Sequence, residues 1–91
     1  MQLLFNRADG TAQALVTDRE NLGPEKWRHV TVDGRANSET AARTIAQEII
    51  ELLTAGRPVN WRVTFEYKPF TELTLTGRVD GWHLFGRFSF R

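Results

Sequence analysis

Polar and apolar residues alternate along three stretches in the last third of the chain, residues 59–67, 73–79 and 82–90. A repeat of two residues is typical of a strand that buries one face. Asp80-Gly81 separates the second stretch from the third, and this dipeptide favours a two-residue hairpin turn because both central positions of such a turn need positive φ. Residues 67–71 are interpreted as the turn between the first two stretches. We therefore expect three consecutive antiparallel strands, with Val79 opposite Trp82 and Leu75 opposite Gly86.

The first third of the chain contains three more strand-like stretches, residues 3–5, 11–17 and 27–33. A turn is expected at residues 7–10, and Asp33-Gly34 is expected to end the third strand. Residues 18–26 are polar and contain Gly23-Pro24, which predicts a loop. Because it is the longest irregular stretch, we expect this loop to be a mobile, partner-facing segment.

One amphipathic helix is predicted between these two groups of strands. Asn37 or Ser38 can cap its first turn, where Glu39 is favoured by the helix dipole. Gly56 supplies a left-handed residue after the last turn, and Pro58 prevents the helix from continuing. At 100° per residue the apolar side chains fill one half of the helix surface, which is the pattern of a helix laid on a sheet. They are Ala41, Ala42, Ile45, Ala46, Ile49, Ile50, Leu52 and Leu53.

The predicted fold is therefore α+β, with element order β-β-β-α-β-β-β, an antiparallel sheet and one amphipathic helix packed on one face. Residues 1–91 are expected to form a single domain. A helix is roughly 10–12 Å wide and strands lie about 4.8 Å apart, so one helix covers only two or three of six strands. Either the N-terminal strands form a second layer or another chain covers the remaining apolar surface. We expect a partner chain.

Composition limits the location and the class of the protein. Apolar residues make up 41% and charged residues 25% of the chain, which is ordinary for a soluble globular protein. No apolar run has the length a membrane span needs, and the short apolar stretch at residues 1–5 is not expected to act as a signal peptide. The absence of cysteine fits a reducing interior. These features predict a cytoplasmic protein without membrane association. The net charge is +1, but residues 57–91 hold six basic and three acidic residues and are locally positive.

The sequence contains no pattern that indicates catalysis. Three of the four aspartates precede glycine and are explained by turn chemistry, and Glu66 and Glu72 are interpreted as solvated strand ends. His29 and His83 stand in different strands without a second ligand at metal-binding spacing. No nucleophile elbow or glycine-rich phosphate loop is present. We therefore expect no enzyme activity, no metal, and no small-molecule cofactor.

The most distinctive feature is the outward face of the C-terminal strands, where basic and aromatic side chains are predicted to gather. Tryptophan, phenylalanine and arginine are the residue types that dominate protein–protein contacts. We expect a non-enzymatic interaction module, most simply a homodimer, in which the final strand pairs with its copy if it lies at a sheet edge. The predicted interaction surface comprises Trp27, Arg62, Arg78, His83, Phe85, Arg87 and Arg91.

Two other interpretations stay open. The same arginine-rich face predicts binding of single-stranded nucleic acid, with phosphates on arginine and bases stacked on the aromatic rings. A short cysteine-free β/α chain without catalytic motifs is also typical of small phage-encoded or mobile-element accessory proteins, including inhibitors of host defence. No residue pattern supports this last assignment.

Overall fold

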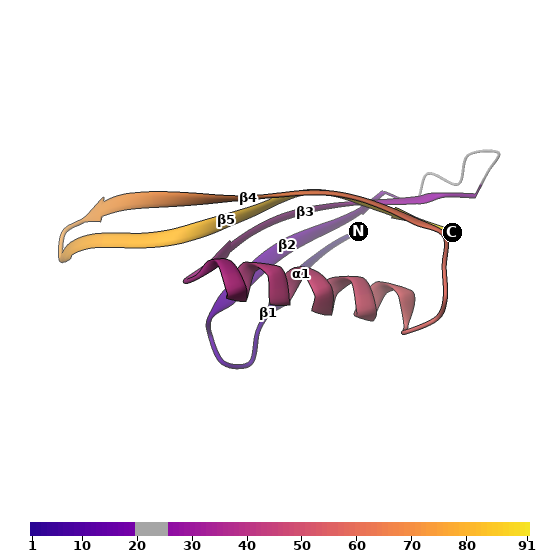
Figure 1. Cartoon of the computed structure of the whole chain (residues 1–91), viewed down its shortest axis with the longest axis horizontal. Coiled ribbons are helices and arrows are strands. Elements are labelled where there is room, and N and C mark those ends of the chain that lie inside the picture. The colour runs from indigo at the N-terminus through magenta and orange to yellow at the C-terminus, as the bar shows by residue number, and fades with distance from the viewer. Residues whose placement is uncertain (20–25) are drawn as a thin grey trace.

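The computed structural model describes residues 1–19 and 26–91. In chain order the elements are β1 (Gln2–Asn6), β2 (Ala12–Arg19), β3 (Arg28–Ala36), α1 (Glu39–Thr54), β4 (Trp61–Thr74) and β5 (Gly77–Phe90). The five strands form one antiparallel sheet in the order β1-β2-β3-β5-β4, and α1 lies along one side of it (Figure 1). The prediction of an α+β fold with an antiparallel sheet and one helix is confirmed.

The number of strands differs from the prediction because residues 61–74 form one strand, β4, instead of two. The expected turn at residues 67–71 and the expected hairpin at Asp80-Gly81 are both wrong. Each of these residues is paired within the β4–β5 ladder, where Phe70 faces Gly81 and Thr71 faces Asp80. The true reversal is at residues 75–76, with Thr74 opposite Gly77. Asp33-Gly34 does not end its strand either, since β3 continues to Ala36.

Side chains explain why the chain turns at residues 75–76 and stays extended at Asp80-Gly81. The Thr74 hydroxyl accepts from the Thr76 amide at 3.3 Å and donates to the Gly77 carbonyl at 2.8 Å, so it closes the turn as serine and threonine side chains often do. Gly81 leaves room for the Phe70 ring, because a Cβ there would lie 2.6 Å from an atom of that ring. Gly81 therefore allows close packing of the two strands and does not form a turn.

The helix forms where its caps predict. The Ser38 hydroxyl accepts from the Ala41 amide at 3.1 Å, and the left-handed Ala55 ends the helix with its amide directed to the carbonyl of Leu52. Its buried stripe, which includes Ile45 and Ile49, belongs to the same core as the inward residues of β2, β3 and β5. The largest side chains of that core with almost no exposure are Phe88, Ile45, Ile49, Leu84 and Val30. In the described part of the chain, no helix has the length and apolarity needed to cross a membrane.

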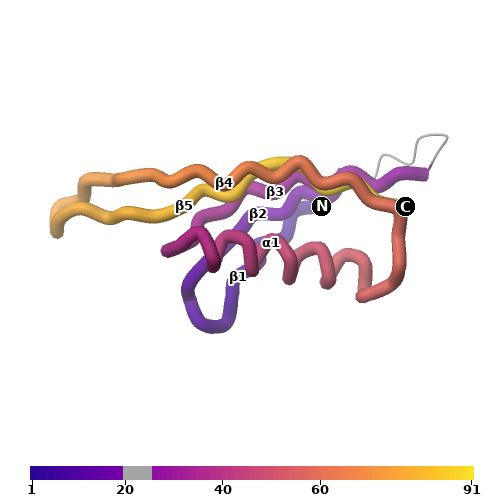
Figure 2. Tube along the Cα trace, in the orientation of Figure 1, coloured from indigo at the N-terminus to yellow at the C-terminus, as the bar shows by residue number. Residues whose placement is uncertain are grey.

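The N-terminal strands join the C-terminal sheet, and no second layer of strands is present among the described residues. The surplus apolar surface appears elsewhere. β3 pairs with β5 only as far as Trp82, so residues 70–81 of β4 and β5 pair with each other alone. We call residues 70–81 the arm. It runs on beyond the first turn of α1 and contributes to a length of 51 Å for a molecule about 20 Å thick (Figures 1 and 2).

Candidate interaction surfaces

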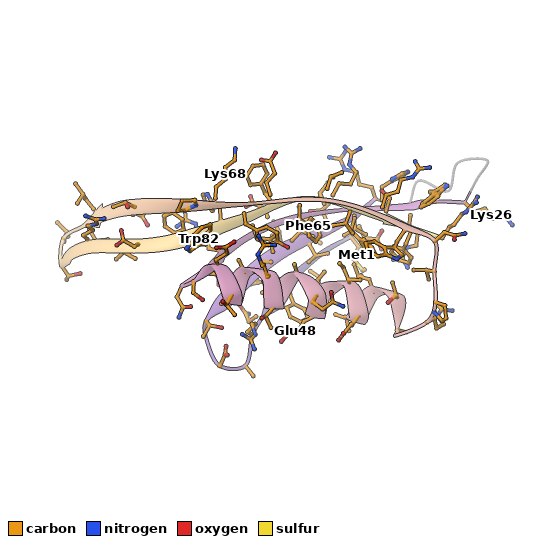
Figure 3. The ribbon with its side chains drawn as sticks, viewed as in Figure 1. Met1, Lys26, Glu48, Phe65, Lys68 and Trp82 are labelled. Carbon is orange, nitrogen blue, oxygen red and sulfur yellow. The ribbon has the colours of Figure 1, made fainter. Side chains whose placement is uncertain are left out.

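The side of the sheet opposite α1, here the outer face, carries six of the seven residues predicted to form an interaction surface. Successive strand residues alternate between the two sides. Because Val30, Leu84 and Phe88 are buried against α1, their neighbours point away from it. In Figure 3 the side chain of Lys68 extends from β4 on this outer side. The predicted residues on the outer face are Trp27, Arg62, His83, Phe85, Arg87 and Arg91.

Trp27 forms the centre of a small basic–aromatic group at one end of the outer face. The Arg62 guanidinium lies 4.8 Å from the centroid of its ring, and that of Arg91 lies 5.1 Å away. Arg91 is positioned by a pair of backbone hydrogen bonds with Asn60, at 3.0 and 3.1 Å. Two guanidiniums on one indole are attracted by the ring quadrupole, and this attraction uses none of their N–H donors.

A second group on the outer face surrounds Phe85. The Lys68 ammonium lies 5.5 Å from the centroid of the Phe85 ring and 3.3 Å from a carboxylate oxygen of Glu66. His83 packs against Phe70, with 4.9 Å between ring centroids. Lys68 was missed by the sequence prediction because residues 67–71 were interpreted as a turn. The signal was present, since the polar–apolar alternation keeps the same phase from residue 61 to residue 68.

Arg78 lies apart from this surface, contrary to the prediction. With β5 continuous through Asp80-Gly81, Arg78 shares the phase of Trp82 and projects on the α1 side of the sheet. It sits on the arm, where its Nε donates to Asp80 at 3.0 Å. The Thr71 hydroxyl donates to the same carboxylate at 2.9 Å. These two hydrogen bonds, that of Arg78 first, hold the pKa of Asp80 below its usual value of 3.8.

β4 is an edge of the sheet. β5, which was expected to pair with its copy if it lay at an edge, is enclosed between β3 and β4. Asn60 and Arg91 exchange both backbone hydrogen bonds, so the even-numbered residues of β4 bond to β5 and the odd-numbered ones direct their N–H and C=O groups to the free edge. Pro69 is odd-numbered, and its missing N–H is therefore on the free side. The edge is fourteen residues long.

Beside this edge, on the α1 side, lies an open hollow of about 620 Å³ between the end of α1 and the start of β4. Ile50, Thr54, Val59, Trp61 and Phe88 are among its lining residues. Trp61 is 60% exposed, although it belongs to the inward row of β4. The hollow thus places apolar side chains, Trp61 among them, next to unpaired backbone groups.

The ionisable groups of the described residues do not assemble into a metal-binding cluster. Among residues 1–19 and 26–91 no group of three His, Cys, Asp or Glu side chains could hold a metal ion. The His29 Nδ1 is 2.8 Å from the Ser89 hydroxyl, and no carboxylate in the described part of the chain completes a triad with them. Burial raises the pKa of Tyr67, partly offset by the nearby Arg43. Within the predicted loop 18–26, Asp18 and Arg19 belong to β2, and residues 20–25 lie outside the described residues.

Comparison of the chain with models of protein families, with curated proteins and with solved structures gives no match.

Proposed function

We propose that this protein is a non-enzymatic interaction module that binds another protein chain through the arm and the free edge of β4. The observation that carries the proposal is the exposure of large apolar side chains on the arm. Leu73 is 83% exposed, Leu75 is fully exposed and Val79 is 47% exposed. An isolated two-stranded hairpin is marginally stable in water. A partner surface that covers these apolar side chains would stabilise the arm.

The chemistry of the arm favours a protein partner over a nucleic acid. Its charged residues are Glu72, Arg78 and Asp80, and Arg78 is already paired with Asp80. A phosphate backbone attracts basic segments, and the arm has more acidic than basic groups. Free backbone groups along β4 add the capacity to bind an extended strand by continuing the sheet.

The test compares Leu73→Lys with the matched variant Leu52→Lys, which places the same charge on an exposed leucine of α1. The fluorescently labelled chain is followed by sedimentation velocity, first alone and then in an extract of the cells that produce it. We expect the wild type and Leu52→Lys to sediment as a complex heavier than the 10.4 kDa chain, and Leu73→Lys to sediment as the free chain. A wild type that stays at the mass of one chain in both conditions, or a complex that survives Leu73→Lys, would overturn the proposal.

Nucleic-acid binding is a second candidate, and the outer face is the observation that favours it. Arg62, Arg87 and Arg91 form no ion pair within the described residues, and Trp27 offers a ring between two of them. Cations beside aromatic rings on an open sheet are the elements of a single-strand platform. The acidic residues Asp33 and Glu66 on the same face reduce its attraction for phosphate.

Fluorescence anisotropy with single-stranded DNA and RNA at low and high salt tests this candidate. Affinity is expected to fall steeply with salt and to be lost in the Arg62→Ala/Arg87→Ala double variant. Arg78→Ala is the matched control, because Arg78 is on the other side of the sheet. Affinity that is insensitive to salt, or lost equally with Arg78→Ala, would exclude the outer face as the binding site.

A further inference from the structure

We propose that the partner of the β4 edge is a second copy of this chain, paired antiparallel through β4 about a two-fold axis at Tyr67. This inference rests on the proposed function and names the partner for the same surface. An antiparallel pair of identical strands has its two-fold axis perpendicular to the sheet. The two sheets would join as one sheet of ten strands, with both α1 helices on one side and both outer faces on the other.

The backbone of β4 is arranged for this pairing. The odd-numbered residues present their N–H and C=O groups to the free edge, and with Tyr67 opposite its own copy every odd-numbered residue faces another. Tyr67 would exchange two hydrogen bonds with its copy, and Val63 would exchange two with Thr71. Pro69 would accept from the Phe65 amide but return no hydrogen bond. The Phe65 carbonyl would therefore lack a donor, once in each copy, and this loss is confined to a single position in the strand.

Charge selects this register over its neighbours. With Tyr67 opposite itself, the outer-face rows set Arg62 against Glu72 and Glu66 against Lys68, so each facing pair of charges is of opposite sign. Opposite charges in facing positions stabilise an antiparallel pair and like charges destabilise it. Two copies of each pair occur in the dimer, which gives four favourable contacts.

Every other nearby register that keeps both helices on one side brings like charges together. Moving the axis by one residue sets Glu66 against its own copy or Lys68 against its own copy. Moving it by two residues sets Arg62 against Lys68 or Glu66 against Glu72. The register at Tyr67 is therefore the one that the sequence of the edge specifies.

The same register also covers the exposed apolar surface. On the α1 side it sets Leu73 of the arm directly opposite Trp61, the two most exposed large side chains in the inward row of β4. The partner's arm would thus lie beside the open hollow, and its tip at Leu75 would reach the level of Val59, which lines that hollow. Each arm gains the neighbouring strand that its own sheet does not supply.

The two copies fit without collision. The two β5 strands would be separated by three strand spacings, about 14 Å, and a helix with its side chains is roughly 10–12 Å wide. Because α1 packs mainly against β5 and strands farther from the edge, the helices would lie at least this far apart. The arms, which project past the sheet in the single chain, would flank the partner's β4 (Figure 2).

Charge reversal provides the first test, with the dimerisation constant of the purified chain measured by sedimentation. Arg62→Glu sets glutamate against Glu72, and Glu72→Arg sets arginine against Arg62, so each variant alone should dimerise about tenfold more weakly than the wild type, or worse. The double variant Arg62→Glu/Glu72→Arg should recover the dimer. A mixture of the two single variants should form a heterodimer, because both of its facing pairs are again of opposite sign. Failure of both recoveries would overturn the register.

A cysteine introduced into this cysteine-free chain provides the second test. Facing residues of a hydrogen-bonded pair have Cα atoms about 5.5 Å apart, within disulfide range, so Tyr67→Cys should form a crosslinked dimer under mild oxidation. Thr71→Cys is the matched control on the same edge. Its copy would be eight residues away along the strand, about 27 Å, and should not crosslink. Crosslinking of Thr71→Cys in preference to Tyr67→Cys would overturn the pairing.

The outcomes separate this inference from the proposed function. A purified wild type that stays monomeric up to high micromolar concentration overturns the homodimer. If that monomer still forms a Leu73-dependent complex in extract, the interaction module stands with a different partner. If no Leu73-dependent complex forms under either condition, both fail.

Discussion

Gly86→Ala is expected to destabilise the protein far more than Gly77→Ala, although both glycines have positive φ. Gly86 has φ of 150° and Gly77 has φ of 133°. A Cβ at Gly86 would lie 2.1 Å from the Thr64 carbonyl oxygen and 2.8 Å from the Phe65 Cα, whereas nothing lies within 4 Å of a Cβ at Gly77. The atoms in the way are backbone atoms of β4, so no side-chain rotation relieves the contact.

The magnitude follows from two contributions. A non-glycine residue held at such a φ costs about 1–3 kcal/mol, and this contribution is common to both variants. Forcing extra volume into a packed site costs about 1–3 kcal/mol more, and this applies to Gly86 alone. For a domain of this size each kcal/mol shifts Tm by about 4–8 °C, so Gly86→Ala should melt at least about 4 °C below Gly77→Ala.

Thermal and urea unfolding followed by circular dichroism measure the difference. All samples must be at one chain concentration, since the stability of a dimer depends on it. Equal losses of Tm in the two variants would refute the reasoning, because they would show that β4 yields to the added methyl group. A wild-type-like Gly86→Ala would show that β4 and β5 are not held at the separation described.

Three further perturbations test other parts of the structure. Tyr67 is the only tyrosine, and its folded-state pKa is raised above 10.0. The free energy of unfolding should therefore be constant below pH 10 and fall as pH rises through the folded-state pKa. Phenolate absorbance should report the raised pKa, and Tyr67→Phe should remove the loss of stability at alkaline pH. Asp18 is buried and paired with Arg28, which is about one-third exposed. In urea unfolding, Arg28→Met should lower the free energy of unfolding by about 3 kcal/mol because it leaves the buried carboxylate unpaired. Asp18→Asn should lower it less, because Arg28 can turn to solvent. Ser38→Ala should cost about 1 kcal/mol in the same assay through loss of the helix cap, while the far-ultraviolet spectrum stays helical.

Local signals in the sequence predicted the helix well because its determinants are local. The Ser38 cap and the apolar stripe through Ile45 and Ile49 act within a few residues of one another, and they set both the position and the buried face of α1. The strands were predicted less well where a local signal had another cause. Asp80-Gly81 interrupts the alternation and resembles a hairpin turn. In the fold Gly81 instead makes room for Phe70, a residue eleven positions away that only the β4–β5 pairing brings near.

The position of each strand in the sheet depended on contacts that no short stretch of sequence encodes. The final strand, β5, became the enclosed strand because both β3 and β4 pair with it. The outer face was predicted better, since strand alternation alone fixes which side a residue faces. Arg78 is the exception, and it was misplaced because the phase of β5 was assumed to restart after Asp80-Gly81.

Dimerisation through β4 and ligand binding by the outer face can occur together, because they use different surfaces of the sheet. Pairing through β4 would place the exposed Arg87 and the half-buried Trp27 of both copies on one continuous surface, with the two copies related by the axis at Tyr67. Arg62 would take part in both, facing Glu72 of the partner while remaining over Trp27. The joined face would present the basic groups of both copies together, and so would attract an anionic ligand more strongly than the face of one copy. If nucleic acid binds, it should therefore bind the dimer more tightly than a monomeric Leu73→Lys chain, even though Leu73 is on the opposite side of the sheet.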